Sequence, residues 1–428
     1  MNTINKYLSL GLFSAAFLVA MNCFGGGFQL NTQGAKALGM GGLFTGVAND
    51  ATCIYFNPAG MTDLKFRHEL YTGVSLIFPM ISIQTTAVSN TDQNSPVATP
   101  LQVFYAYKYN GNLSFGLGIN NQFGSKASYP DDWQGRNIVQ SLSLKTYMFQ
   151  PTVAYMFDEH FSVGGGFDYV LGSFDLRRAM PLQAANRPEG ELHLSGKGSC
   201  VGYNLGVLAT SKNIGTLGIS FRSKLKVDLK NGDASFTNIP IDVSNIFPAS
   251  TSFNSSVTLP AVLSIGISHK FLNDRLTVGF DFWRTFWSSY DTLKFTFANP
   301  NTPEVVSPRS YKDVNYFGLG GTYVLSKKFA VRAGGFYDFS PIQDGYVSPE
   351  LPDANTIGWA IGGSYKLSNR IAFDLSFLNY NLTMTRSFTQ AGFSGTYHKI
   401  ISVLDFGVNF SFGQRVFAKG ELEVNDAK

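Results

Sequence analysis

Residues 400–412, IISVLDFGVNFSF, alternate in polarity with a period of two residues. From Leu404 to Phe412 the even positions are apolar, and the odd positions between them are polar or small: Asp405, Gly407, Asn409 and Ser411. Successive side chains of a β-strand point to opposite faces, so this pattern predicts a strand with one apolar and one polar face. The same alternation occurs in Phe161–Leu171 and Arg370–Leu378.

Fourteen segments of this kind follow residue 64, and the connections between them fall into two classes. The segments are residues 65–79, 101–109, 113–121, 138–157, 161–180, 190–210, 214–230, 257–270, 275–297, 311–325, 329–340, 356–367, 370–383 and 400–412. The connections after even-numbered segments are short, as in Asn110-Gly111-Asn112, whereas most of those after odd-numbered segments are long, as in 80–100 and 231–256. Short turns at one end and long loops at the other are typical of outer-membrane barrels. A large soluble β-protein, the alternative, has no reason to sort its connections in this way.

The composition agrees with a membrane protein built from strands. Charged residues make up 14% of the 428 residues, against about 25% in ordinary globular proteins. The mean hydropathy is only +0.01, and beyond the N-terminus no apolar run approaches the roughly 20 residues of a transmembrane helix. We therefore predict an all-β fold, a 14-stranded antiparallel transmembrane β-barrel. The net charge of +4 includes no basic run, so we expect no nucleic-acid partner.

The N-terminus has the parts of a secretory signal peptide. Lys6 precedes an apolar core from Tyr7 to Met21, and small residues follow. We place the cleavage after Gly25, so that residues 1–25 are removed and the protein is exported to the outer membrane of a Gram-negative cell. Lipidation of Cys23 is an alternative, although the residues just before it lack the expected Leu and small residue.

Two cysteines remain after this cleavage, Cys53 and Cys200. We expect free thiols, with a disulfide between them as the alternative in an oxidising periplasm. The chain ends in a polar stretch, residues 413–428, which we expect to form a tail after the last strand.

Residues 26–64 are rich in glycine, show no strand alternation and end in the turn sequence Asn57-Pro58-Ala59-Gly60. They precede the first of the strands in residues 65–412. A barrel of fourteen strands leaves a lumen that its own side chains cannot fill. We therefore predict that residues 26–64 form a hatch that plugs the lumen.

Motifs of enzymes are absent from the sequence. No G-x-S-x-G nucleophile elbow and no HExxH motif occurs, and the five histidines are dispersed along the chain. The glycines from Gly39 to Gly46 lack the βαβ context of a dinucleotide site. We expect no enzymatic activity, no cofactor and no metal.

Several motifs together resemble the FadL/TodX (OmpP1) family of outer-membrane transporters for long-chain fatty acids and hydrophobic compounds. They occur in the family's order and spacing from Gly26 to Phe412. They are Gly26-Gly27-Phe28-Gln29-Leu30-Asn31, Asn57-Pro58-Ala59, Asp132-Trp133-Gln134-Gly135-Arg136, Phe149-Gln150-Pro151-Thr152-Val153-Ala154-Tyr155, Gly218-Ile219-Ser220-Phe221-Arg222-Ser223, Leu259-Pro260-Ala261, Arg332-Ala333-Gly334, Tyr337-Asp338-Phe339-Ser340-Pro341 and Leu351-Pro352-Asp353.

The resemblance implies a transport route. Substrate would be captured by extracellular loops, bound inside the barrel, and released sideways into the membrane through a kink in the third strand after the hatch moves. It also implies the residues that take part, by their positions in this sequence. The pocket and the trigger would be formed by Gly26, Gly27 and Phe28. The hatch turn that faces the third strand would be Asn57, Pro58 and Ala59, and the kink would be Asn121, Phe123 and Gly124. The capture loop would include Tyr129 and Trp133.

A fatty acid presents an apolar chain and one carboxylate. Each buried methylene contributes roughly 0.8 kcal/mol, and no energy source is visible in the sequence, so we expect passive transport. Candidate cations for the carboxylate, by strand position, are Arg177, Arg178, Arg222 and Arg332. The alternative for each is a solvated lumen wall or an ion pair with Asp168 or Asp338.

The substrate class stays open among fatty acids, alkanes and monoaromatics. We expect a hydrophobic small molecule and outer-membrane lipid as the partners of a monomeric protein. A general or plugged porin for small polar solutes is the alternative function.

Overall fold

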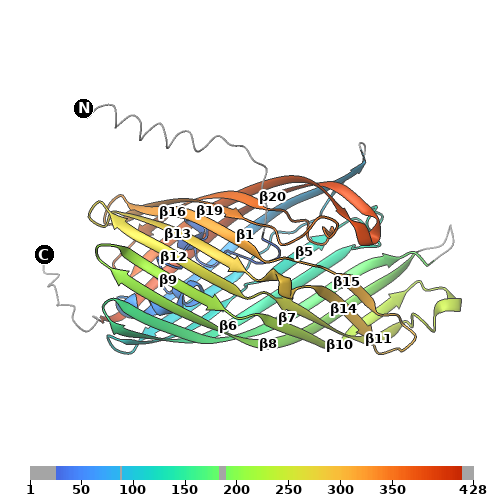
Figure 1. Ribbon diagram of the computed structural model, residues 1–428, viewed down its shortest axis with the longest axis horizontal. Helices are drawn as coiled ribbons and strands as arrows, with labels where there is room; N and C mark the ends of the chain where they lie inside the picture. The colour runs from blue at the N-terminus through green and yellow to red at the C-terminus, as the bar shows by residue number, and fades with distance from the viewer. Residues whose placement is uncertain (1–25, 87–88, 183–188, 417–428) are drawn as a thin grey trace.

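The computed structural model describes residues 26–86, 89–182 and 189–416. Within these ranges the chain forms a closed antiparallel barrel of fourteen strands, five of which are interrupted or extended by a second segment (Figure 1). The strands are β1 (Phe66–Thr86), β3 (Leu101–Lys108), β4 (Leu113–Asn120) with β5 (Gly124–Ser128), β6 (Ser141–Asp158), β7 (Phe161–Met180), β8 (Gly190–Ser211), β9 (Gly215–Arg222) with β10 (Leu225–Thr237), β11 (Ser250–Leu259) with β12 (Val262–Phe271), β13 (Leu276–Thr285) with β14 (Thr292–Phe297), β15 (Val305–Pro308) with β16 (Val314–Val324), β17 (Phe329–Asp338), β18 (Thr356–Lys366), β19 (Ile371–Phe388) and β20 (Phe393–Arg415).

The barrel closes because β1 pairs with β20 on one side and with β3 on the other. A further short strand, β2 (Ser89–Asp92), folds back on the end of β1. The predicted fold class is confirmed. The signal peptide, Cys23 and residues 417–428 of the tail lie outside the described residues.

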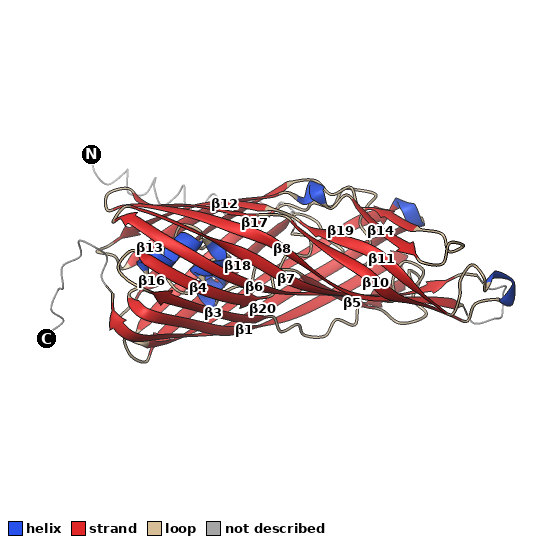
Figure 2. Ribbon diagram, turned by 90° about the horizontal axis from the view of Figure 1, so that it is seen from below, coloured by secondary structure: helices blue, strands red, loops and turns tan. Residues whose placement is uncertain are grey.

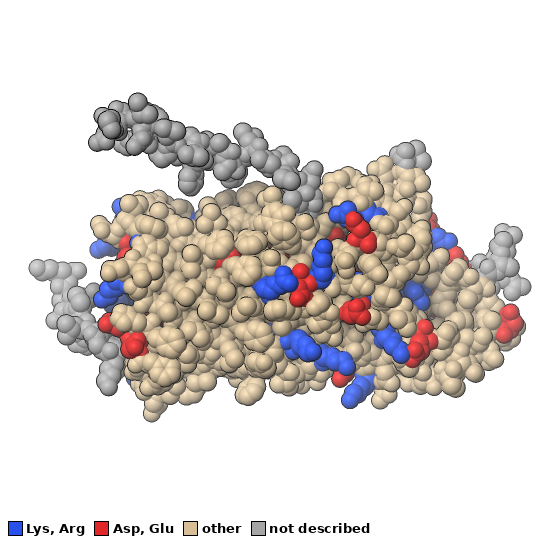
Figure 3. All heavy atoms as spheres, in the orientation of Figure 1, with Lys and Arg blue, Asp and Glu red and all other residues tan. Residues whose placement is uncertain are grey.

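The outside of the wall is apolar. Phe167, Val201, Leu205 and Ile361 are each more than half exposed, while Asp168, between Phe167 and Tyr169 on the same strand, is fully buried. Figure 3 shows a broad band with few charged side chains toward the short-turn end of the barrel, and most charges beyond this band. This is the surface that a lipid bilayer solvates.

Short helices of the described chain lie inside the barrel, near the end that carries the short turns (Figure 2). They are α2 (Ala35–Gly39), α3 (Cys53–Phe56) and the 3-10 helix η1 (Pro58–Asp63). In the described part of the chain, no helix has the length and apolar character needed to cross a membrane. Cys53 is buried in α3 and Cys200 lies on β8, and both thiols are free.

Glycine on the inner wall makes room for the backbone of these helices. A Cβ at Gly334 of β17 would overlap the backbone of Met40, just after α2. At the next residue, Gly335, a Cβ would lie 3.5 Å from its nearest neighbour, the carbonyl oxygen of Gly358. Gly334 therefore has no space for a side chain, whereas Gly335 has.

The strands differ from the predicted segments in length and continuity. β1 runs to Thr86 and β20 begins at Phe393, because the polar residues at their outer ends pair with each other beyond the predicted ends. The predicted strand 275–297 is broken between Thr285 and Thr292, where the 3-10 helix η3 (Trp287–Ser289) turns inward. Pro260 lacks the N–H that a continuous ladder requires and divides β11 from β12.

Candidate functional site

A cavity of about 260 Å³ lies inside the barrel, lined by the strand ends next to the long loops. Its walls are mostly aliphatic and aromatic side chains from β6, β7, β8 and β14: Leu142, Leu144, Phe174, Leu192, Leu194 and Phe295. Sites for apolar ligands have this composition, with a few polar groups that fix orientation.

The ionisable groups of the cavity are Arg178, Arg309, Glu350 and two tyrosines, Tyr290 and Tyr311. Arg309 forms an ion pair with Glu350 at 2.8 Å. Burial alone would lower the pKa of Arg309, but the nearby Glu350 carboxylate raises it above its ordinary value, so the guanidinium stays charged.

Arg178, unlike Arg309, has no carboxylate partner among the described residues. It lines the same cavity, and its Nε is buried without a hydrogen-bond partner. A cavity with aliphatic walls therefore contains a cation whose charge is available to a ligand.

Phe28 forms part of the cavity lining and is itself buried. Its ring makes edge-to-face contacts with Trp287, Tyr290 and Phe123, at centroid distances of 4.8, 5.5 and 5.9 Å. Edge-to-face pairs of this kind contribute beyond the area that they bury. Phe28 therefore connects the cavity to Phe123, in the interruption between β4 and β5.

The interruption comprises Asn121, Gln122 and Phe123. β4 pairs with β6 up to Asn120–Met148, and β5 resumes with Gly124–Lys145, so three residues of one strand oppose two of the other. The side chain of Thr146 replaces the missing ladder, since its hydroxyl donates to the carbonyl oxygen of Phe123 at 2.6 Å.

The chain near the N-terminus fills this interruption from inside. The backbone N–H of Leu30 donates to the carbonyl oxygen of Gln122 at 2.8 Å, and the N–H of Gly124 donates to that of Phe28 at 3.1 Å. Gln29 and Phe123 form an antiparallel bridge. Residues 26–30, called here the N-terminal segment, thus occupy the place of a neighbouring strand beside β5.

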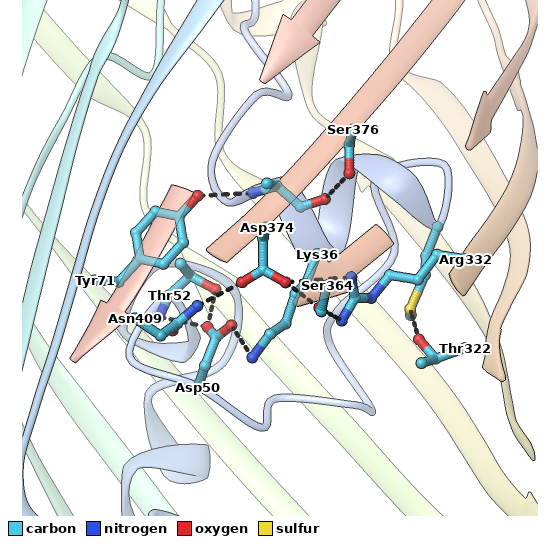
Figure 4. Close-up of polar contacts among 12 residues, drawn as sticks. Lys36, Asp50, Thr52, Tyr71, Thr322, Arg332, Ser364, Asp374, Ser376 and Asn409 are labelled. Carbon is cyan, nitrogen blue, oxygen red and sulfur yellow. Dashed lines mark hydrogen bonds and ion pairs between the residues drawn. The ribbon is translucent and has the colours of Figure 1, made fainter. Parts of the chain in front are cut away.

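The body of the hatch is held differently, by buried polar groups of the wall (Figure 4). Lys36 pairs with Asp50 at 2.9 Å within the hatch. The backbone of Ala35 donates to Tyr71 of β1 and accepts from Ser376 of β19. Burial opposes ionisation of Asp50, yet Lys36 and Thr52 lower its pKa overall. Likewise Asp50 raises the pKa of Lys36 despite burial, so both groups are charged.

The hatch turn of Asn57, Pro58 and Ala59 was expected to face the third strand, but it lies against other strands. Asn57 donates to the carbonyl oxygens of Thr45 and Val207, and a Cβ at Gly164 or Gly206 would collide with Pro58. The turn therefore packs against β7 and β8, and the prediction that it faces the third strand is wrong. The hatch residues that pack against the glycines of β4 are Ile54, before the turn, and Met61, after it.

Tyr129 and Trp133 were expected to collect substrate in a loop, which requires exposure. In the structure their side chains are 5% and 4% exposed and stack at 4.2 Å. Tyr129 donates to the carbonyl oxygen of Pro349, and Trp133 to that of Val139. The Tyr129 bond joins two loops and the Trp133 bond lies within one loop, and neither side chain presents a capture surface.

Three of the four candidate arginines are paired with carboxylates. Arg177 pairs with Glu191 at 2.9 Å, Arg222 with Asp168 at 3.2 Å and Arg332 with Asp374 at 3.3 Å. Of these four arginines, only Arg178 lines the cavity. Arg309 was missed, because a charged residue in a predicted loop has no pattern that indicates where it points.

No group of three or more His, Cys, Asp or Glu side chains in the described ranges could hold a metal ion.

Comparison with known proteins places this geometry in a family. The family model described as outer membrane protein transport protein (OMPP1/FadL/TodX) matches residues 16–412. The long-chain fatty acid transport protein of Salmonella typhi is 24% identical over 390 residues, covering 84% of this chain and 88% of the relative. Outer membrane protein P1 of Haemophilus influenzae is 22% identical, covering 87% and 90%.

Solved structures show the same fold. A Pseudomonas aeruginosa FadL homologue superposes with a TM-score of 0.78 at 18% identity, covering 91% of this chain and all of the other. The Pseudomonas putida toluene transporter TodX gives 0.73 at 17% identity, covering 90% and 100%. The family match spans nearly the whole barrel and the hatch, and the chain belongs to the OMPP1/FadL/TodX family of outer-membrane transport proteins.

Proposed function

We propose that this protein takes up long-chain fatty acids passively across the outer membrane. The substrate binds in the cavity, and it leaves sideways into the membrane through the interruption between β4 and β5. The N-terminal segment closes that exit. The observation that supports this most is the position of Phe28, whose side chain lines the cavity while its backbone pairs at the interruption.

The energetics require a moving part. A sixteen-carbon chain offers on the order of 10 kcal/mol at about 0.8 kcal/mol per buried methylene, before ordering costs. Binding of that strength makes capture easy and release slow. Withdrawal of Phe28 removes part of the lining and opens the exit in one movement. The cavity, the exit and the segment all belong to one chain, so a monomer suffices.

The orientation of the substrate follows from Arg178. A carboxylate that reaches it forms a charge-assisted hydrogen bond, one of the stronger kinds in proteins. The hydrocarbon chain then lies along the aliphatic walls.

The size of the cavity favours monoaromatic hydrocarbons as a second candidate. A volume of about 260 Å³ lies slightly below the usual range of drug-sized ligand sites, and an engineered cavity of about 150 Å³ binds benzene. A long chain would extend beyond it, whereas a monoaromatic would fit inside. Arg178 has no role for such a ligand, and for this reason we place fatty acids first.

Replacing Arg178 by glutamine distinguishes the two substrates. We expect oleate affinity to fall about 10- to 100-fold, the effect of a lost hydrogen bond to a charged group, and toluene binding to change little. Binding to the purified protein and uptake of labelled oleate and toluene by cells measure both. Arg177→Gln, at the neighbouring residue outside the cavity, is the matched control. Equal oleate binding by both variants would contradict the assignment of Arg178 as the partner of the carboxylate. Oleate uptake by cells with the wild-type protein that equals the uptake of cells lacking it would contradict the proposed fatty acid transport.

The porin alternative predicts a water-filled lumen. We expect the wild-type protein to show no large steady current in planar lipid bilayers, since the hatch occupies the lumen. Gly334→Val, which forces the wall side chain into the backbone of Met40, should displace the hatch and raise the conductance severalfold. Gly335→Ala, on the opposite face, should leave it unchanged. A large steady current through the wild-type protein would favour the porin.

A further inference from the structure

Two carboxylates face the first residues of the N-terminal segment. The backbone N–H of Gly27 donates to Oδ2 of Asp353 at 3.0 Å. A Cβ built on Gly26 would lie only 2.8 Å from Oδ2 of Asp338. Asp338 ends β17, and Asp353 lies in the loop before β18, so both belong to the wall that the segment leans on.

The charges at this point do not balance. Lys399 of β20 lies 3.8 Å from Asp353 and is the one cation near the two carboxylates in the described part of the chain. Oδ1 of Asp353 is buried without a hydrogen-bond partner. The side chain of Asp338 forms no hydrogen bond or ion pair with any described residue, although its backbone belongs to the ladder of β17. Two carboxyl groups beside one ammonium, Asp353 buried and Asp338 half-buried, are costly to keep ionised unless another positive charge is present.

The space beside the two carboxylates has room for the backbone of Gly26 and Gly27 but not for a side chain on either residue. Gly26 and Gly27 have φ values of 127° and 63°, in the region that favours glycine. A Cβ on Gly27 would lie 2.6 Å from the ring of Trp287. The site therefore accommodates a main-chain group at Gly26 and excludes a side chain there.

Cleavage after Gly25, expected from the sequence, would turn the nitrogen of Gly26 into an α-ammonium. We propose that this ammonium is the missing cation, and that its ion pair with Asp338 and Asp353 holds the N-terminal segment over the exit. Bond lengths and angles place the α-nitrogen about 2.5 Å from the site of a Cβ, so it lies within about 5 Å of the Asp338 carboxylate. Asp338 and Asp353 are thus positioning residues for the segment.

The inference rests on the proposed function in one respect, namely that the N-terminal segment closes the exit. It adds that closure depends on maturation. A precursor, or a protein with extra residues before Gly26, lacks an ammonium at this position. Its segment would be held by the backbone bonds at Gln122 and Gly124, the bond from Gly27 to Asp353 and the Phe28 ring, without the ion pair.

Hydrogen exchange of the backbone amides tests the ion pair directly. The purified mature protein, with its first residue determined by mass spectrometry, is compared before and after selective acetylation of the α-amine. We expect exchange at Gly27 and Leu30 to accelerate at least about tenfold on acetylation, as for the loss of a charge-assisted hydrogen bond. Asp338→Asn should produce part of this acceleration, and acetylating this variant should add less than it does in the wild type, because only Asp353 remains to pair with the ammonium. Asp344→Asn, which changes an exposed carboxylate in the loop that follows β17, is the matched control.

The proposal is overturned if acetylation leaves exchange unchanged, if it accelerates exchange equally in Asp338→Asn, or if the mature chain does not start at Gly26. Acetylation alters no side chain of the fold, so misfolding of a variant cannot hide the answer. Uptake measurements remain separate. If deleting residues 26–28 changes oleate uptake while acetylation has no effect on exchange, the segment is the gate but the amine is not its anchor.

Discussion

Replacing Arg332 by leucine is expected to lower the free energy of unfolding by about 3–5 kcal/mol. The side chains of Arg332 and Asp374 are 5% and 0% exposed, and their charged atoms lie 3.3 Å apart. Without Arg332, the Asp374 carboxylate stays buried with only neutral donors, Ser364 and Asn409. Lys36 of the hatch also lies near Asp374 (Figure 4), but it is engaged by Asp50.

Urea unfolding of the purified protein in lipid vesicles, followed by tryptophan fluorescence, measures this loss. Arg386→Leu is the matched control, because its ion pair with Asp344 at 3.0 Å is solvent-exposed and exposed pairs contribute at most about 1 kcal/mol. Replacing Arg332 and Asp374 together by leucine should recover most of the loss, since neither charge is then left unpaired. A loss for Arg332→Leu no larger than that of the control would contradict the buried pair.

The buried Arg332–Asp374 pair also helps to explain how the body of the hatch is fixed to the wall. The ion pair lies on the wall beside α2, next to the Lys36–Asp50 pair of the hatch (Figure 4). Together with the bonds from Ala35 to Tyr71 and Ser376, these contacts fix the hatch body. The N-terminal segment is held by two backbone bonds at the interruption, the bond from Gly27 to Asp353 and one aromatic ring, together with the proposed ion pair of its ammonium. The segment is therefore the part of the plug that moves at least cost.

The fold could be predicted from the sequence because its two signals are local. A period of two residues indicates strands, as in residues 400–412, and the sorting of short and long connections indicates a barrel. Both depend on side-chain direction and chain length alone. The strand boundaries were less accurate. Beyond the predicted ends, residues such as Thr385 and Thr396 still pair across β19 and β20, and polar pairs of this kind produce no apolar alternation.

The site was only partly predictable, because its contacts join residues far apart in the sequence. Arg309 meets Glu350, and Tyr129 meets Pro349, across loops whose conformations no periodicity specifies. The family resemblance directed attention to Phe28 and Phe123, and the structure brings them together. It could not place Asn57, whose amide reaches β8, since glycines at positions 164 and 206 of the wall decide where the turn fits.

A disulfide can test the proposed exit, because Gln29 and Phe123 face each other across the interruption. The hydrogen bonds on either side of them, Leu30 to Gln122 and Phe28 to Gly124, make them a non-hydrogen-bonded antiparallel pair. Such pairs have Cα atoms about 4.5 Å apart, within the range of roughly 4.4–6.8 Å that disulfides span. Gln29→Cys with Phe123→Cys should thus bond the N-terminal segment to the barrel wall.

The measurement is uptake of labelled oleate by cells carrying this double variant, oxidised and then reduced with dithiothreitol. Each single variant is the control, and Cys53 and Cys200, which are free, are common to all three proteins. We expect the oxidised double variant to fall to the uptake of cells lacking the protein, and reduction to restore it to the level of the single variants. Equal uptake by the oxidised and reduced double variant, with the disulfide verified, would contradict release through the interruption between β4 and β5.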